Sequence, residues 1–192
     1  SDPKYLGAEE RELEHMAVYR VDKDGTVVEV THEVEKPNGI ALSPDEKTLY
    51  VADHNNGGEN ISDPNAPEAV PGAMKIYAFP LGADGLVNGD RRTLVDFGKE
   101  SGCDGMALDT GGNIYLTVRS LKRPGVMIID PEGKEVGFIP TGPAGQSDPA
   151  AATGLPSNGE FGIGEEASVL YVTVEMSLYR IKLNATGLHH QY

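Results

Sequence analysis

Residues 37–53 read PNGIALSPDEKTLYVAD, and residues 103–118 repeat the pattern as CDGMALDTGGNIYLTV. A looser third copy has SNGEFG at residues 157–162 and LYVTV at residues 170–174. The copies share an Asn or Asp followed by Gly, a short strand, and a later strand that starts with Leu or Ile and Tyr. Repeats of about 40–60 residues built from short strands are typical of a β-propeller, because one such unit cannot bury its own apolar face. The pattern therefore predicts an all-β propeller.

Counting strands by their alternating apolar residues predicts how many blades the chain holds. A first hairpin at residues 16–30 is followed by two four-stranded repeats and one three-stranded repeat, about three and a half blades in all. We expect one propeller domain, divided as follows: the end of a preceding blade at 1–36, a first full repeat at 37–102, a second repeat at 103–156, and an incomplete last repeat with a tail at 157–192. A long polar loop is expected at residues 55–72.

The composition excludes several classes of partner. The 192 residues carry a formal net charge of -14, which disfavours binding to nucleic acid or to an anionic membrane surface. The same acidity suits a soluble protein that holds a hard cation with oxygen ligands, although solubility alone also explains it. No stretch is apolar enough to span a membrane. The sequence leaves the compartment open between the cytoplasm and secretion.

The one cysteine, Cys103, cannot form a disulfide within the chain. It precedes Asp104, but no activating base is evident nearby in the sequence, so a nucleophilic role is disfavoured.

The repeats resemble the gluconolactonase-like family, which includes senescence marker protein 30 (regucalcin) and the luciferin-regenerating enzyme. Residues 37–53 are similar to its most recognisable segment, and residues 103–106 resemble its later Asp-Gly motif. Residues 1–5, 12–13 and 18–20 resemble the blade that precedes the Asn-Gly segment in bacterial and fungal gluconolactonases. Residues 170–173 and 178–181 resemble the C-terminal end of the family.

The resemblance implies a six-bladed propeller with a divalent metal in its central channel, which hydrolyses sugar lactones or related cyclic esters. In the family the metal is held by a Glu near the N-terminus, the Asn of the Asn-Gly motif and the Asp of the later Asp-Gly motif. Asn38 and Asp104 match the last two. The Glu and a second, substrate-facing Asn have no counterpart, so we expect an N-terminally incomplete propeller. Asn158 falls at the equivalent point of the third repeat and is a candidate substrate-binding residue.

The chemistry of these residues agrees with such a site. Asp104 would serve as a charged metal ligand and as the catalytic general base, and Asn38 would supply a neutral carbonyl oxygen. Oxygen ligands favour Ca2+, while Zn2+, Mg2+ and Mn2+ also occupy such sites. The alternative is that Asn-Gly and Asp-Gly only make tight turns, which both pairs commonly do. Their recurrence at equivalent repeat positions favours the site.

Other polar residues are better explained without function. Asp45 and Asp109 lie between strands and indicate turns, and Asp53-His54 indicates the end of a strand. His189-His190 near the C-terminus suggests an exposed tail more than a metal site.

The predicted function is divalent-metal-dependent lactone hydrolysis of the gluconolactonase type. Two alternatives stay open: a non-catalytic propeller that binds a small ligand or a protein, and an inactive fragment of the lactonase. Because two blade faces would lack neighbours, we also expect self-association or pairing with the missing N-terminal part.

Overall fold

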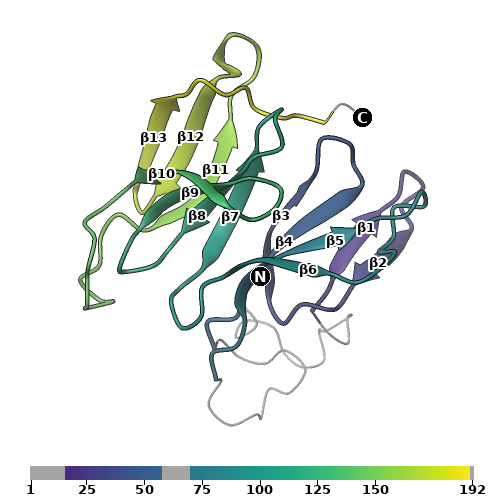
Figure 1. Cartoon of the computed structure of the whole chain (residues 1–192), viewed down its shortest axis with the longest axis horizontal. Helices are drawn as coiled ribbons and strands as arrows, with labels where there is room; N and C mark the ends of the chain where they lie inside the picture. Colours follow the sequence, from purple (N-terminus) through teal and green to yellow (C-terminus); the bar gives the residue numbers. More distant parts are fainter. Residues whose placement is uncertain (1–15, 58–69, 191–192) are drawn as a thin grey trace.

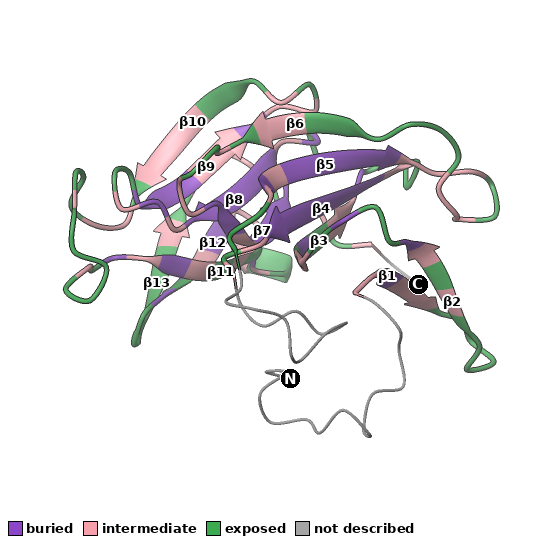
Figure 2. Ribbon diagram, turned by 90° about the horizontal axis from the view of Figure 1, so that it is seen from below, coloured by how far each residue is buried: buried purple, intermediate pink, exposed green. Residues whose placement is uncertain are grey.

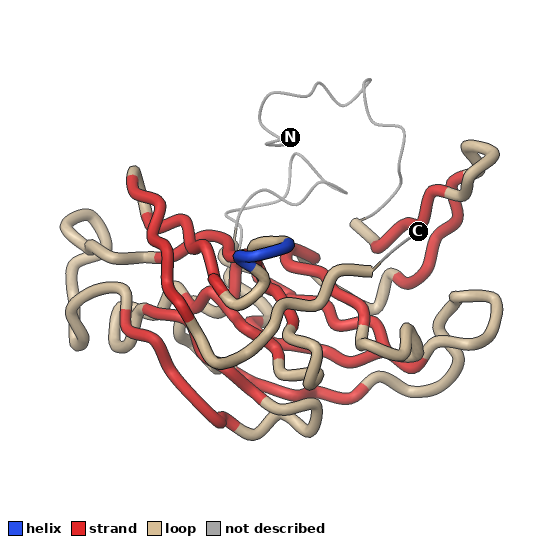
Figure 3. Tube along the Cα trace, turned by 90° about the horizontal axis from the view of Figure 1, so that it is seen from above, coloured by secondary structure: helices blue, strands red, loops and turns tan. Residues whose placement is uncertain are grey.

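The computed structural model describes residues 16–57 and 70–190, and the regular secondary structure in these ranges is almost entirely β-strand, joined by loops (Figure 3). Residues 1–15 and most of the expected polar loop, residues 58–69, lie outside the described ranges. Within those ranges, no helix is long and apolar enough to cross a membrane. A short 3-10 helix at Gly164–Glu166 accompanies these strands: β1 (Val18–Val21), β2 (Val27–Thr31), β3 (Pro37–Leu42), β4 (Thr48–His54), β5 (Met74–Pro80), β6 (Arg92–Asp96), β7 (Cys103–Leu108), β8 (Ile114–Val118), β9 (Gly125–Ile129), β10 (Glu135–Pro140), β11 (Pro156–Phe161), β12 (Val169–Val174) and β13 (Ser177–Lys182).

The strands form four antiparallel sheets, each made from consecutive strands (Figure 1). Two sheets are four-stranded, β3–β6 and β7–β10, one is three-stranded, β11–β13, and one is the hairpin β1–β2. The first strands of the three larger sheets contact each other in the order β3, β7, β11, so the sheets radiate from these inner strands. This is the architecture of an arc of a β-propeller, and the predicted fold class is confirmed. The unit boundaries proposed from the sequence stay predictions.

Strands β4, β5, β7 and β8 are mostly buried (Figure 2), and their apolar side chains form one core cluster. From β4, Tyr50 and Ala52 pack towards the β7–β10 sheet, whereas Leu49 and Val51 pack towards the β1–β2 hairpin. Successive residues of a strand point to opposite faces, so both faces of this strand must be apolar. The interface between the β7–β10 and β11–β13 sheets is built in the same way. There the rings of Tyr115 and Phe161 meet edge to face, with 5.0 Å between their centroids.

An extra residue interrupts the pairing of each inner strand near its start. Pro37 pairs with Asp53 but Ile40 with Val51, and the same shift occurs in β7 and β11. Such β-bulges twist a strand and re-aim its side chains. The Asn-Gly and Asp-Gly pairs therefore lie inside strands, and neither Gly39 nor Gly105 has a positive φ. The alternative that these pairs form tight turns is wrong.

Threonine hydroxyls hold two of the three bulges. The Thr117 hydroxyl accepts the Gly105 N–H at 2.9 Å and lies 2.8 Å from the Gly105 carbonyl oxygen. The Thr173 hydroxyl makes the same pair of contacts with the backbone of Asn158, at 3.0 and 3.1 Å. In the first repeat the equivalent residue is Ala52, which has no hydroxyl. The backbone groups released by each of these two bulges are thus satisfied by the neighbouring strand.

We expect Thr117→Val to destabilise the protein by about 1–3 kcal/mol, because the buried Gly105 N–H loses its acceptor. Thr173 is exposed, so water replaces its hydroxyl. Thr173→Val, as the matched control, should cost about 1 kcal/mol or less. Urea unfolding followed by circular dichroism measures both changes. Equal costs for the two variants would contradict the assigned role of Thr117.

Candidate functional site

Three polar side chains lie at the start of the three inner strands. Asn38 is the second residue of β3, Asp104 the second of β7, and Asn158 the third of β11. Asn38 Nδ2 donates a hydrogen bond to Asp104 Oδ1 at 2.8 Å, across the boundary between two sheets. The Asn158 side chain lies directly against Gly105, the neighbour of Asp104. The fold thus brings all three sequence-predicted residues to one edge of the arc.

The glycine after each polar residue allows this approach. A Cβ on Gly39 would lie 2.7 Å from the Asp104 carbonyl oxygen, and a Cβ on Gly105 would lie 2.1 Å from Asn158 Oδ1. Neither distance is tolerated by a real side chain. Each glycine therefore leaves room for the polar motif of the next sheet, which is why Asn-Gly and Asp-Gly recur.

A cationic residue that the sequence analysis missed lies beside Asp104. Arg119 Nη1 is 3.7 Å from Asp104 Oδ2 and donates to the Pro156 carbonyl oxygen at 3.2 Å. About a third of the Arg119 side chain is exposed. Arg119 therefore bridges the second and third sheets next to the candidate site.

His54 occupies the position in the first repeat that Arg119 occupies in the second. Its Nδ1 donates to the Cys103 carbonyl oxygen at 2.8 Å, again reaching the first residue of the next inner strand. Aligning the repeats on their Tyr-containing strands would have revealed this shared position. The expectation that His54 only ends a strand was incomplete, because it also ties two sheets together.

Asp53 supports the site without reaching it. Its carboxylate accepts the backbone N–H groups of Glu35 and Lys36, each at 2.8 Å, and so holds the segment that enters β3. Burial raises the pKa of this carboxyl, and these two hydrogen bonds oppose that rise. Asp53 is therefore structural, in agreement with the sequence analysis.

Cys103 is not a nucleophile. Its side chain is fully buried, and burial raises the pKa of the thiol well above its usual range. The thiol donates to the Gly105 carbonyl oxygen, so it belongs to the packing around the bulge.

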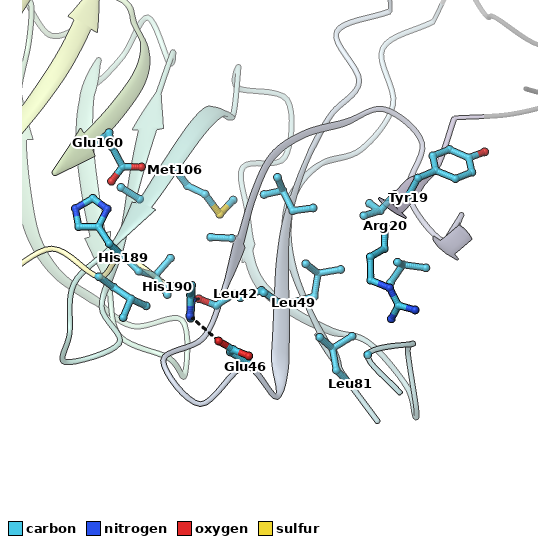
Figure 4. A pocket seen from close by; sticks show the side chains of 18 residues that line it. Tyr19, Arg20, Leu42, Glu46, Leu49, Leu81, Met106, Glu160, His189 and His190 are labelled. Carbon is cyan, nitrogen blue, oxygen red and sulfur yellow. Dashed lines mark hydrogen bonds and ion pairs between the residues drawn. The ribbon is translucent and has the colours of Figure 1, made fainter. Parts of the chain in front are cut away.

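A groove of about 580 Å³ lies further along the inner strands, and its walls are mostly apolar (Figure 4). Its lining includes Leu42, Leu49 and Met106 but none of the three polar residues of the candidate site. His190 stands at the groove with its Nδ1 3.0 Å from a Glu46 carboxylate oxygen. The C-terminal histidines therefore pack on the ends of the sheets, and the expected exposed tail is wrong for His190. Its polar lining residues include Glu46, Glu160 and His189, and they lie apart from Asn38 and Asp104.

The donors at the candidate site fit a hard cation in chemical type. Asp104 offers carboxylate oxygens and Asn38 an amide oxygen, and such ligands suit Ca2+ or Mg2+. In residues 16–57 and 70–190 no three His, Cys, Asp or Glu side chains gather in a metal-binding group. Two side chains fill only part of the six to eight positions that Ca2+ takes. The remaining ligands would be water, substrate, or residues outside the described ranges.

Comparison with known protein families shows which family the chain belongs to. Residues 5–61 and 71–176 match the family described as SMP-30/Gluconolactonase/LRE-like region. The chain belongs to this family.

Curated relatives in the family include two lactone-cleaving enzymes by name. The chain is 27% identical over 184 residues to a gluconolactonase of Zymomonas mobilis, a match that covers 92% of the chain and 43% of the relative. It is 31% identical over 180 residues to the lactonohydrolase oryH of Aspergillus oryzae, covering 89% of the chain and 34% of the relative. The chain thus spans less than half the length of these relatives.

Solved structures agree with the fold. A gluconolactonase from Xanthomonas campestris superposes with a TM-score of 0.63 at 29% identity, covering 90% of the chain and 46% of that protein. Regucalcin from Agrobacterium tumefaciens, described as a calcium-binding protein, has a TM-score of 0.62 at 21% identity, covering 90% of the chain and 54% of that protein. The regucalcin likeness supports the fold alone.

We expect Gly39→Ala to destabilise the protein by about 1–3 kcal/mol, because the new methyl group meets the Asp104 backbone. Gly159→Ala is the matched control, since the nearest atom to its Cβ is the Tyr171 carbonyl oxygen at 3.3 Å. Thermal and urea unfolding measure the difference between the two variants. A larger loss for Gly159→Ala would contradict the role given to the Asn-Gly contact.

Proposed function

We propose that this chain carries the Asn–Asp part of the active site of a gluconolactonase-type hydrolase, which opens sugar lactones or related cyclic esters. The hydrogen bond between Asn38 and Asp104, made between two inner strands at the candidate site, is the observation that carries the proposal. Membership of the family and the names of the relatives support the reaction class.

In this proposal Asp104 is the general base. Its carboxylate is partly exposed at the edge of the arc, where a substrate and water can reach it. It takes a proton from a water molecule whose oxygen attacks the lactone carbonyl carbon. The ring C–O bond then breaks, and the released ring oxygen receives the proton back from Asp104. Water is consumed and a hydroxy acid is formed.

The two asparagines orient the reacting groups. Asn38 Nδ2 holds Asp104 Oδ1 at 2.8 Å, which fixes the rotamer of the base. Asn158 Oδ1 accepts the N–H of Gly159 at 2.9 Å. This bond leaves the Asn158 Nδ2 group to donate to a hydroxyl oxygen of the substrate.

Asn38 and Asp104 are also the residues that would hold the divalent cation, for which Ca2+ is the first choice and Mg2+, Mn2+ and Zn2+ are the alternatives. When bound, such a cation supplies Lewis acidity that polarises a carbonyl and lowers the pKa of water.

We expect Asp104→Asn to lower lactone hydrolysis by at least about 100-fold while the protein still folds, because the base and one charged ligand are lost. The measurement is acid release from D-glucono-δ-lactone and other lactones in the presence of Ca2+. The assay uses the whole chain, and circular dichroism verifies that the variant is folded.

Asp45→Asn is the matched control. This carboxylate accepts the Ser43 hydroxyl at 2.7 Å in a turn and should be irrelevant to hydrolysis. Unchanged lactone hydrolysis in Asp104→Asn would favour the alternative of a propeller that binds a ligand without catalysis.

A further inference from the structure

Both carboxylate oxygens of Asp104 face positively polarised groups of the chain itself. Asn38 Nδ2 donates to Oδ1 at 2.8 Å, and Arg119 Nη1 lies 3.7 Å from Oδ2. A cation that binds Asp104 must therefore share or displace one of these internal partners. Of the two, only Arg119 carries a full positive charge.

Arg119 is held in this place by the fold. Its backbone N–H donates to the Gly102 carbonyl oxygen at 3.0 Å, and its Nη1 donates to the Pro156 carbonyl oxygen at 3.2 Å. The two contacts anchor it to the segment before β7 and to the first residue of β11. These contacts place the guanidinium beside Asp104.

We propose that Arg119 is an internal counter-ion of Asp104 that weakens and thereby tunes divalent-cation binding at the candidate site, an inference that rests on the proposed function. In the cation-free state it balances the charge of Asp104. When a divalent cation binds, two positive groups share one carboxylate, and their repulsion lowers the cation affinity.

The proposal gives a reason for a positively charged guanidinium beside Asp104, the candidate general base. If Arg119 only stabilised the local fold, its hydrogen bond to Pro156 would matter and its charge would not. Removal of the charge should raise the metal affinity if Arg119 acts as a counter-ion, and should leave it equal or lower it if Arg119 only stabilises the fold.

The test is isothermal titration calorimetry of the whole chain with CaCl2 in chelator-treated buffer at low ionic strength. Arg119→Gln removes the charge but keeps an N–H donor for the Pro156 carbonyl, and Arg119→Met removes both. We expect Arg119→Gln to bind Ca2+ about three- to tenfold more tightly than the wild type, as expected for a partly exposed charge acting on a divalent ion. Arg119→Lys should stay within about twofold of the wild type.

Two controls separate this effect from a change in net charge or in folding. Arg180→Met removes an arginine on β13, the outer strand of the third sheet, whose Nη2 lies 2.7 Å from a Glu166 carboxylate oxygen, and it should leave Ca2+ affinity unchanged. In 1 M NaCl the difference between Arg119→Gln and the wild type should shrink, because salt screens the repulsion. Thermal unfolding verifies that each variant is folded. If Arg119→Met does not fold, the comparison of Arg119→Gln with the wild type is sufficient.

This inference would be overturned if folded Arg119→Gln bound Ca2+ as well as the wild type or more weakly. The metal site itself would stand if the wild type bound Ca2+ and Asp104→Asn did not. If neither the wild type nor any Arg119 variant bound Ca2+, Mg2+ or Mn2+, both the metal site and the role of Arg119 would be overturned.

Discussion

Burial of the sheet faces against neighbouring sheets is the constraint on which the rest of this structure depends. Ile76 of β5, Leu116 of β8 and Val172 of β12 are all fully buried, one in each of the three larger sheets. A sheet of four short strands cannot bury both of its faces alone, so the blades stabilise one another. This packing fixes the spacing of the inner strands, and it therefore fixes the distance between residues that belong to different repeats.

The β-bulges connect this apolar packing to the candidate site. Each bulge gives an inner strand one additional residue, and the polar side chain at or beside it lies at the edge of the arc, away from the packed layer. A charged group there keeps part of its hydration, so Asp104 avoids most of the cost of a buried carboxylate. The following glycine lets the adjacent motif approach, and Thr117 satisfies the backbone that the bulge in β7 releases. The contacts at the bulges therefore stabilise both the inner strands and the candidate site.

Much of this arrangement could be predicted from the chain alone. Strands such as 114–118 have strongly apolar, β-branched sequences, and the recurrence of Asn38 and Asp104 at one point of the repeat indicates a shared edge. The expected equivalence of Asn158 is off by one residue, because the strand register aligns Asn158 with Gly105. Alignment of the repeats gives Arg119 and His54 a shared position, but it cannot give the contact of Arg119 with Pro156, which lies 37 positions further along the chain. Nor could the sequence exclude turns at Asn38-Gly39, since the same dipeptide suits a turn and a bulged strand.

The sequence by itself determined the all-β class, the propeller repeat and the family, because these depend on apolar periodicity and on short motifs that are local to each repeat. Only the tertiary structure decided that Asn38 donates to Asp104 across 66 residues of chain and that Arg119 shares the same carboxylate. It also decided that glycine is needed at positions 39 and 105 for close approach and not for a positive φ. The physical reason is that contacts between blades depend on how separate sheets pack, which no local pattern of residues encodes.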